Sequence, residues 1–91
     1  MDSILQKTKE CFVCHSTVCL ESHHCFHGTA NRRLSEEYGL KVWLCREHHT
    51  GNHGVHFDKG FDNDLKQFAQ TVFEQQYDRE TFIQRFGKNY L

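Results

Sequence analysis

The sequence has no proline, no internal repeat, no low-complexity tract and no stretch with the composition of a linker. These absences favour a single domain over residues 1–91. A long apolar run is missing as well, because no stretch approaches the roughly 20 apolar residues that a helix needs to cross a bilayer. Apolar residues make up only 37% of the chain, so the core must be small, and eight phenylalanines supply much of it. A single core is marginal at this length, which favours a structural metal as a staple.

An excess of positive charge is also missing, since 11 lysines and arginines stand against 12 aspartates and glutamates and the formal net charge is −1. Nucleic-acid-binding proteins usually carry a basic surface, so this balance counts against that class unless a local cluster meets phosphates. Arg32, Arg33 and Lys41 form such a cluster in the sequence.

The first ten residues are polar and lack the apolar segment of a secretory signal. With the missing apolar run, this predicts a cytoplasmic protein without a membrane partner. The five cysteines are an odd number, which argues against a closed disulfide framework. Cysteines in a reducing compartment bind metal more often than they pair.

Two short motifs carry the ligands for a structural zinc. Cys11 and Cys14 form a C-x2-C pair, and Cys45 with His48 forms a C-x2-H pair about 30 residues later. A two-residue gap lets both side chains of a pair turn toward one ion, and two pairs complete the tetrahedron that zinc requires. The sequence therefore predicts one closed zinc site.

Two cysteines remain outside these motifs. We interpret Cys19 and Cys25 as packing thiols. The alternatives are that Cys25 competes for a zinc ligand position or that one of the two is a reactive thiol.

Hydrophobic periodicity and turn residues predict a small α+β domain. We expect a core over residues 11–57 and a helical cover over residues 62–87. Trp43 and Phe57 are expected to pack in the core, with stacking on bases as the alternative. The predicted elements are an irregular arm or short helix over 1–10, a knuckle at 11–14, strands over 17–24 and 40–44, a helix over 30–38 ended by Gly39, a segment over 45–56 that is helical at its start, a helix over 62–77, and a last helix between Asp78 and Gly87.

The histidines predict a second site. His23 and His24 end a predicted strand, where neighbouring side chains point to opposite faces, so one can bind a metal while the other addresses a water molecule. His49 and His53 are four residues apart, which places them on one face of a helix. His56 extends that face if the segment stays helical, or replaces His53 if it does not.

A metal held by imidazoles next to a free histidine suits phosphodiester hydrolysis. The reaction needs an activated water, and neutral imidazole can accept the proton because its ordinary pKa is near 6.5. It also needs neutralised phosphoryl oxygens and help for the leaving alkoxide, which a divalent ion supplies. Mg²⁺, Mn²⁺, Ni²⁺ and Zn²⁺ are all candidates for this ion.

The order of these motifs resembles a known family. A C-F-V-C pair, then H-H, then L-C-R-E-H-H followed by further histidines is similar to the zinc-containing HNH, or ββα-metal, nucleases. Residues 28–58, GTANRRLSEEYGLKVWLCREHHTGNHGVHFD, and the final F-G-K-N-Y-L resemble small HNH-like proteins of phages and prophages. The RecA-dependent recombination-enhancement nucleases of phages are more distantly similar. With residues 11–27 the resemblance covers about half of the chain.

This resemblance implies a ββα-metal (HNH, or His-Me finger) fold with a structural zinc and added C-terminal helices. It implies a metal-dependent DNA endonuclease or nickase, encoded by a phage or prophage and acting in a bacterial cytoplasm. DNA is the implied partner, and the small size of the domain favours a homodimer or a larger phage or recombination complex. The alternative is a non-catalytic zinc module that binds nucleic acid or protein.

The resemblance also assigns roles. It makes His24 the general base and places His23 where the family has a metal-binding aspartate or histidine. His49 and His53 match further ligands of the catalytic ion, with His56 as the rival of His53. The four motif residues Cys11, Cys14, Cys45 and His48 match the structural zinc ligands.

Two features depart from simple correspondence. The family's middle asparagine normally lies a few residues before the L-C pair, where this chain has none, so Asn31 is the candidate to orient the base. Arg32 and Arg33 follow it on a predicted helix. They either grip phosphates near the cut or form a solvated helix face with Glu36 and Glu37.

Overall fold

The computed structural model describes residues 2–52 and 54–91. Within these ranges the chain forms a two-stranded antiparallel sheet and four helices, so the α+β class predicted from the sequence is confirmed. Leu20 pairs with Cys45 and His24 pairs with Lys41, which fixes the register of the sheet. The elements in chain order are β1 (Leu20–His24), α1 (Thr29–Tyr38), β2 (Lys41–Cys45), α2 (Arg46–His49), α3 (Lys59–Gln76) and α4 (Arg79–Phe86).

The helices begin and end at residues with clear physical reasons. Gly39 ends α1 in the left-handed conformation, with φ of 71°, and Gly87 ends α4 in the same way, with φ of 81°. Asp78 caps α4 by accepting a hydrogen bond from the backbone of Thr81. These three predictions are confirmed. Helix α3 begins earlier than the predicted residue 62, because Asp58 caps it by accepting from the amide of Phe61.

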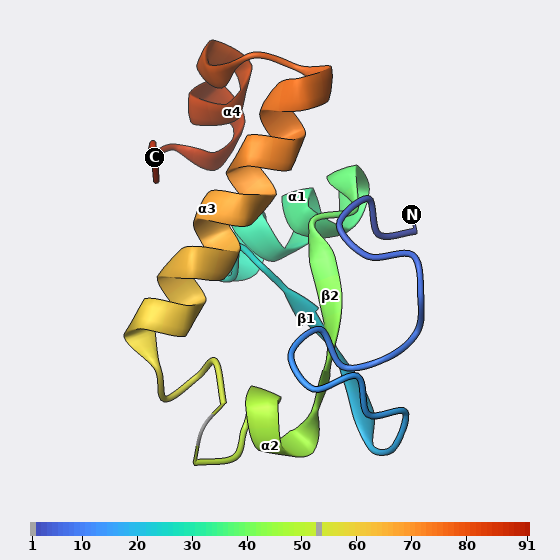
Figure 1. The fold of residues 1–91 in the computed structure, drawn as a ribbon. Coiled ribbons are helices and arrows are strands. Elements are labelled where there is room, and N and C mark those ends of the chain that lie inside the picture. The colour runs from blue at the N-terminus through green and yellow to red at the C-terminus, as the bar shows by residue number, and fades with distance from the viewer. Residues whose placement is uncertain (1, 53) are drawn as a thin grey trace.

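Phenylalanines from three segments form the centre of the core. Phe26, which follows β1, packs against Phe82 and Phe86 of α4 with ring centroids 5.3 and 4.9 Å apart. Phe73 of α3 joins the cluster at 5.3 Å from Phe82. The predicted phenylalanine core is therefore confirmed, and α3 and α4 close it from one side of the sheet (Figure 1).

Two packing predictions are wrong. Phe57 is 71% exposed, in the loop that joins α2 to α3. Cys19 is also exposed, in a turn ahead of β1 where its φ is 54°. Cys25 is fully buried as predicted, and burial raises the pKa of its thiol to about 12. Trp43 is only half-buried.

The N-terminal arm forms no helix or strand over residues 2–10 and covers the free edge of β2. The amide of Trp43 donates to Gln6 at 2.8 Å, and Ser3 donates to the carbonyl of Lys41. The amide of Ile4 donates to the carbonyl of Gly39 at 2.9 Å. These bonds satisfy the backbone groups that an edge strand otherwise exposes. The arm thereby lies on the side of the sheet away from α3 (Figure 1).

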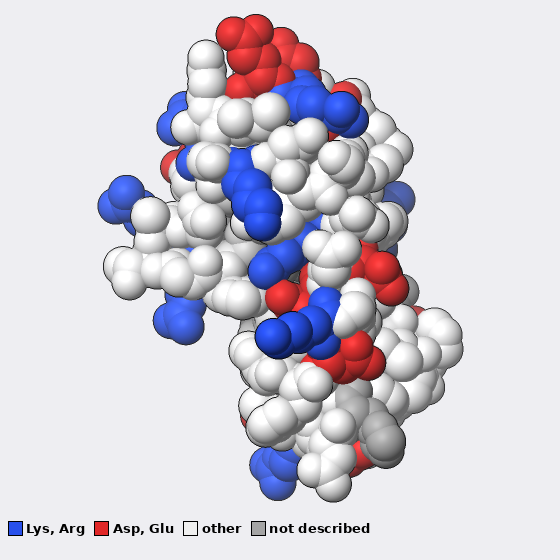
Figure 2. Space-filling view, turned by 90° about the vertical axis from the view of Figure 1, so that its left-hand side faces the viewer, with Lys and Arg blue, Asp and Glu red and all other residues white. Residues whose placement is uncertain are grey.

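The face of the molecule that carries α3 is mixed in charge. On the side of the molecule that carries α3, lysine and arginine side chains are spread among acidic ones and do not gather into one basic patch (Figure 2). No helix in the described ranges is both long and apolar enough to cross a membrane.

Candidate metal centres

The four motif residues predicted to bind zinc converge on one point. Their ligand atoms all lie within 4.8 Å of one another. Sulfur ligands at about 2.3 Å from a tetrahedral zinc stand about 3.8 Å apart, and Sγ of Cys14 and Sγ of Cys45 are 3.8 Å apart. Nδ1 of His48 lies 3.2 Å from Sγ of Cys45 and 3.6 Å from Sγ of Cys11. Spacing and chemistry therefore both fit a zinc ion.

The local backbone prepares this cluster for a cation. The turn after Cys11 closes when the amide of His15 donates to the carbonyl of Cys11 at 2.9 Å. Burial raises the pKa of the Cys11 thiol, but hydrogen bonds from the amides of Cys45, Cys14 and Val13 outweigh it and lower the pKa to about 6. The thiolate is the form that binds zinc.

A second cluster joins His23, His49 and His56. One ring nitrogen from each lies within 4.8 Å of the others. Nε2 of His49 and Nε2 of His56 are 3.1 Å apart, close to the roughly 3.3 Å that two nitrogens reach when both bind one ion at about 2.0 Å. The structure thus brings together three of the predicted ligands. His53 lies outside the described residues.

Three different segments supply these ligands. His23 lies on β1 and His49 is the last residue of α2. After α2 the chain turns back, and the amides of Val55 and His56 donate to the carbonyls of His48 and His49 at 2.9 and 3.3 Å. Gly54 permits this return, since a Cβ there would stand 2.5 Å from the carbonyl oxygen of His49. A folded-back loop, and not a continuous helical face, places His56 beside His49.

The burial of His23 gives an independent sign of a ligand. Its side chain is 3% exposed, and Nε2 is buried without a hydrogen-bond partner in residues 2–52 and 54–91. A buried polar atom left unpaired costs about 1–3 kcal/mol. Burial, followed by the nearby His49 and His56, lowers the pKa of His23 to about 3. The ring is therefore neutral, and a neutral imidazole nitrogen aimed at two others fits a bound cation.

Glu21 on β1 holds His49 in place. Its Oε1 lies 2.7 Å from Nδ1 of His49. Because a carboxylate only accepts, Nδ1 carries the hydrogen and Nε2 presents its lone pair to the cluster. Carboxylates in this position orient histidine ligands in many metal sites. No motif in the sequence pointed to Glu21, since 28 positions separate the two partners.

His24 lies beside the cluster and is bound to an acidic residue of α1. Its Nε2 is 2.9 Å from Oε1 of Glu36, and Nζ of Lys41 lies 2.6 Å from Oε2 of the same carboxylate. Hydrogen bonds from Lys41 and from His24 lower the pKa of Glu36 to about 2. Glu36 is therefore ionised and accepts the Nε2 hydrogen of His24, so in the neutral form of the ring Nδ1 carries the lone pair. The sequence predicted Asn31 as the residue that orients His24, but in the structure Glu36 makes the contact to its ring.

A hollow of about 340 Å³ connects His24 with the three-histidine cluster. Arg32 lines it, and a neighbouring hollow of about 440 Å³ contains His24, Arg32 and Arg33. Both arginines therefore lie beside His24, where they line the two hollows. Asn31 does not line either hollow among the residues that are described.

His27 is a further histidine of this hollow that the sequence did not single out. Its Nε2 lies 3.3 Å from Oδ1 of Asp62 on α3, and Nζ of Lys66 lies 2.9 Å from the other oxygen. Burial raises the pKa of Asp62, but hydrogen bonds from Lys66 and His27 outweigh it and lower the pKa. The carboxylate of Asp62 on α3, itself paired with Lys66, therefore holds the ring of His27 beside the hollow.

The chain was compared with models of known protein families, with curated proteins and with solved structures, and none matched.

Proposed function

We propose that this protein is a metal-dependent DNA endonuclease or nickase of the HNH, ββα-metal type. The observation that carries the proposal is the three-histidine cluster, with the buried unpaired Nε2 of His23, next to a separate histidine that is oriented by a carboxylate. The antiparallel pair β1 and β2 followed directly by the short α2 supports the ββα assignment. A zinc at the Cys11 cluster would serve structure alone, because all four ligand positions are filled by protein.

Different residues of the site have different roles in the proposed hydrolysis. His23, His49 and His56 would hold a divalent ion, which when bound would neutralise charge on the phosphoryl oxygens and assist the leaving alkoxide. His24 takes a proton from the attacking water at Nδ1, since its Nε2 hydrogen is donated to Glu36. As the proton arrives, the ionised carboxylate stabilises the imidazolium.

The arginines bind the substrate backbone in this proposal. Arg32 lines both hollows beside His24 and Arg33 lines one of them, and both side chains are exposed. A guanidinium matches the geometry of a phosphate and forms two parallel hydrogen bonds to it. Contacts of this kind position a strand without reading its sequence.

The donor set narrows the choice of ion. All three ligand atoms are imidazole nitrogens, which suit Zn²⁺, Ni²⁺ and related transition ions. Mg²⁺ prefers oxygen ligands in an octahedron. We therefore expect Ni²⁺ to support cutting better than Mg²⁺ does.

A plasmid-nicking assay tests the proposal. Zinc-loaded protein with Ni²⁺ should convert supercoiled plasmid to the nicked form. The His24→Asn variant should lose at least 100-fold in rate, the lower range for removal of a general base, while it keeps its zinc. His15→Asn is the matched control, because His15 is exposed and its ring contacts Glu10 outside the site. Cutting that survives in His24→Asn would refute the role of His24.

The balanced charge favours a second candidate, a zinc module that binds nucleic acid or protein without cutting. This candidate predicts one tightly held zinc and no second ion in a Ni²⁺ titration. It also predicts that no nicking occurs at any Ni²⁺ concentration. Metal analysis alongside the plasmid assay separates the two.

A further inference from the structure

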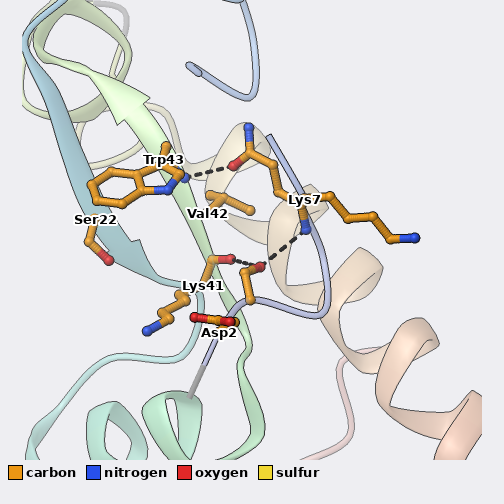
Figure 3. A pocket seen from close by; sticks show the side chains of 8 residues that line it. Asp2, Lys7, Ser22, Lys41, Val42 and Trp43 are labelled. Carbon is orange, nitrogen blue, oxygen red and sulfur yellow. Dashed lines mark hydrogen bonds between the residues drawn. The ribbon is translucent and has the colours of Figure 1, made fainter. Parts of the chain in front are cut away.

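A third hollow, of about 700 Å³, lies between the N-terminal arm and the sheet, outside the site described so far. Trp43 and Ser22 stand on its sheet side, and Lys7 and Asp2 come from the arm (Figure 3). The backbone amide of Trp43 donates to Gln6, so the arm and β2 form a fixed frame. The indole ring is half-buried and remains accessible in the hollow.

Lysines lie near the ring, together with one acidic residue of the hollow, Asp2. Nζ of Lys9 lies 4.6 Å from the centre of the Trp43 ring, and Lys7 lines the hollow. Neither lysine forms a salt bridge within the part of the chain that the structure describes. The ammonium of Lys9 covers one face of the ring, which leaves the other face for a base. An aromatic face with ammonium groups near it is the combination that binds unpaired nucleotides, because a base stacks on the ring and phosphates meet the cations.

This hollow and the hollow of the histidine site share a lining residue on β1. Ser22 lines both, and the sheet register places Ser22 opposite Trp43 and His24 opposite Lys41. All four residues share one face of the sheet, because alternate residues of a strand point the same way. Two residues of a strand span about 7 Å, so the Ser22–Trp43 pair lies about that far along the sheet from the His24–Lys41 pair.

We propose that this hollow binds an unpaired nucleotide of the DNA strand, close to the bond that is cut. The inference rests on the proposed nuclease function and specifies its substrate as single-stranded or locally opened DNA. In a closed duplex both faces of each base are stacked on neighbours, so Trp43 has no face to contact. The base stacks on Trp43, and Lys7 and Lys9 meet the adjoining phosphates.

The sole tryptophan of the chain reports on this contact directly. Unlabelled (dT)12 added to zinc-loaded His24→Asn protein should quench Trp43 fluorescence with saturation. A blunt 12-base-pair duplex or inorganic polyphosphate of equal charge should quench far less. If (dT)12 binds by anisotropy of a labelled copy while Trp43 fluorescence does not change, the base does not stack there and the proposal is wrong.

Variants test the ring and the cations separately by the same anisotropy assay. Trp43→Ala should weaken (dT)12 binding about tenfold, whereas Trp43→Phe keeps a ring and most of the affinity. Lys9→Glu should weaken binding, and Lys88→Glu is its matched control, since Nζ of Lys88 lies 5.1 Å from the centre of the Tyr90 ring. Equal losses in both lysine variants, or in both tryptophan variants with zinc retained, would overturn the proposal. Because binding is measured without cutting, failure here is distinct from failure of the nuclease function.

Discussion

A single carboxylate decides which nitrogen of His49 faces the three-histidine cluster. The bond from Nδ1 of His49 to Glu21 is 2.7 Å long and crosses from α2 to β1. Glu21→Ala frees the ring to rotate and to change tautomer. We expect this change to weaken Ni²⁺ binding at the cluster about 10- to 100-fold, measured by calorimetric titration of zinc-loaded protein. Glu80→Ala on α4 is the control, and equal Ni²⁺ affinity in the Glu21 variant would show that Glu21 does not position His49.

Single residues also show what could be predicted from the sequence. The predicted residues have partners close in the sequence, and the missed residues have distant ones. Cys11 and Cys14 share a local motif, so their spacing alone indicates a common ion. Glu36 and Glu21 act through partners 12 and 28 positions away, and glutamates on exposed helix or strand positions are common. Only the antiparallel register and the packing of α1 bring them to the histidines.

At the scale of elements, the cap of α4 gives a pH-dependent contribution to stability. A hydrogen bond with the Thr81 side chain, followed by one from its amide, lowers the pKa of Asp78 below its ordinary value of 3.8. A carboxyl whose pKa is lower in the folded state stabilises the fold above its unfolded pKa. That contribution is lost as the pH falls through the folded pKa.

We therefore expect Asp78→Ala to lower Tm at pH 7 by about 5 °C, and the gap to wild type to narrow as the pH falls below 4. Asp78→Asn keeps an oxygen acceptor at the cap and should retain most of the neutral Tm, but without the acid-dependent loss. Thermal melts followed by circular dichroism across this range measure both effects. A gap that stays constant with pH would show that the carboxylate charge does not contribute.

The elements themselves were largely predictable because their boundaries depend on local chemistry. Gly39 and Gly87 adopt positive φ at the two helix ends where glycine was expected to stop a helix. The segment after Cys45 was harder, since α2 ends at His49 and the following turn depends on the close approach of Gly54 to α2. The spacing of His49 and His53 predicted a helical face. Among the described residues, His56 joins the cluster by a tertiary contact that no periodicity encodes.

For the whole molecule, the two candidate metal centres differ in what they connect. The Cys11 cluster joins the turn at residues 11–14, the end of β2 and α2, and two of its ligands, Cys11 and Cys45, belong to the same buried core as the phenylalanines. Zinc binding in small metal-stapled domains contributes about 10–16 kcal/mol, as much as the entire net stability of a typical domain, about 5–15 kcal/mol. The three-histidine cluster has no such role, because β1 and α2 are already held by the sheet and the zinc ligands.

This difference predicts opposite outcomes when one ligand is substituted in each cluster. Cys45→Ser should abolish stoichiometric zinc and the cooperative thermal transition, whereas Cys19→Ser should leave both unchanged, since Cys19 is exposed and outside the cluster. His23→Ala should keep zinc and a cooperative transition within a few degrees of wild type, because it removes a buried unpaired nitrogen as well as packing. It should nevertheless lose Ni²⁺ binding. Zinc analysis, melting curves and Ni²⁺ titration on the three variants test whether only the Cys11 cluster stabilises the fold. The prediction is wrong if His23→Ala unfolds the protein or if Cys45→Ser melts like wild type.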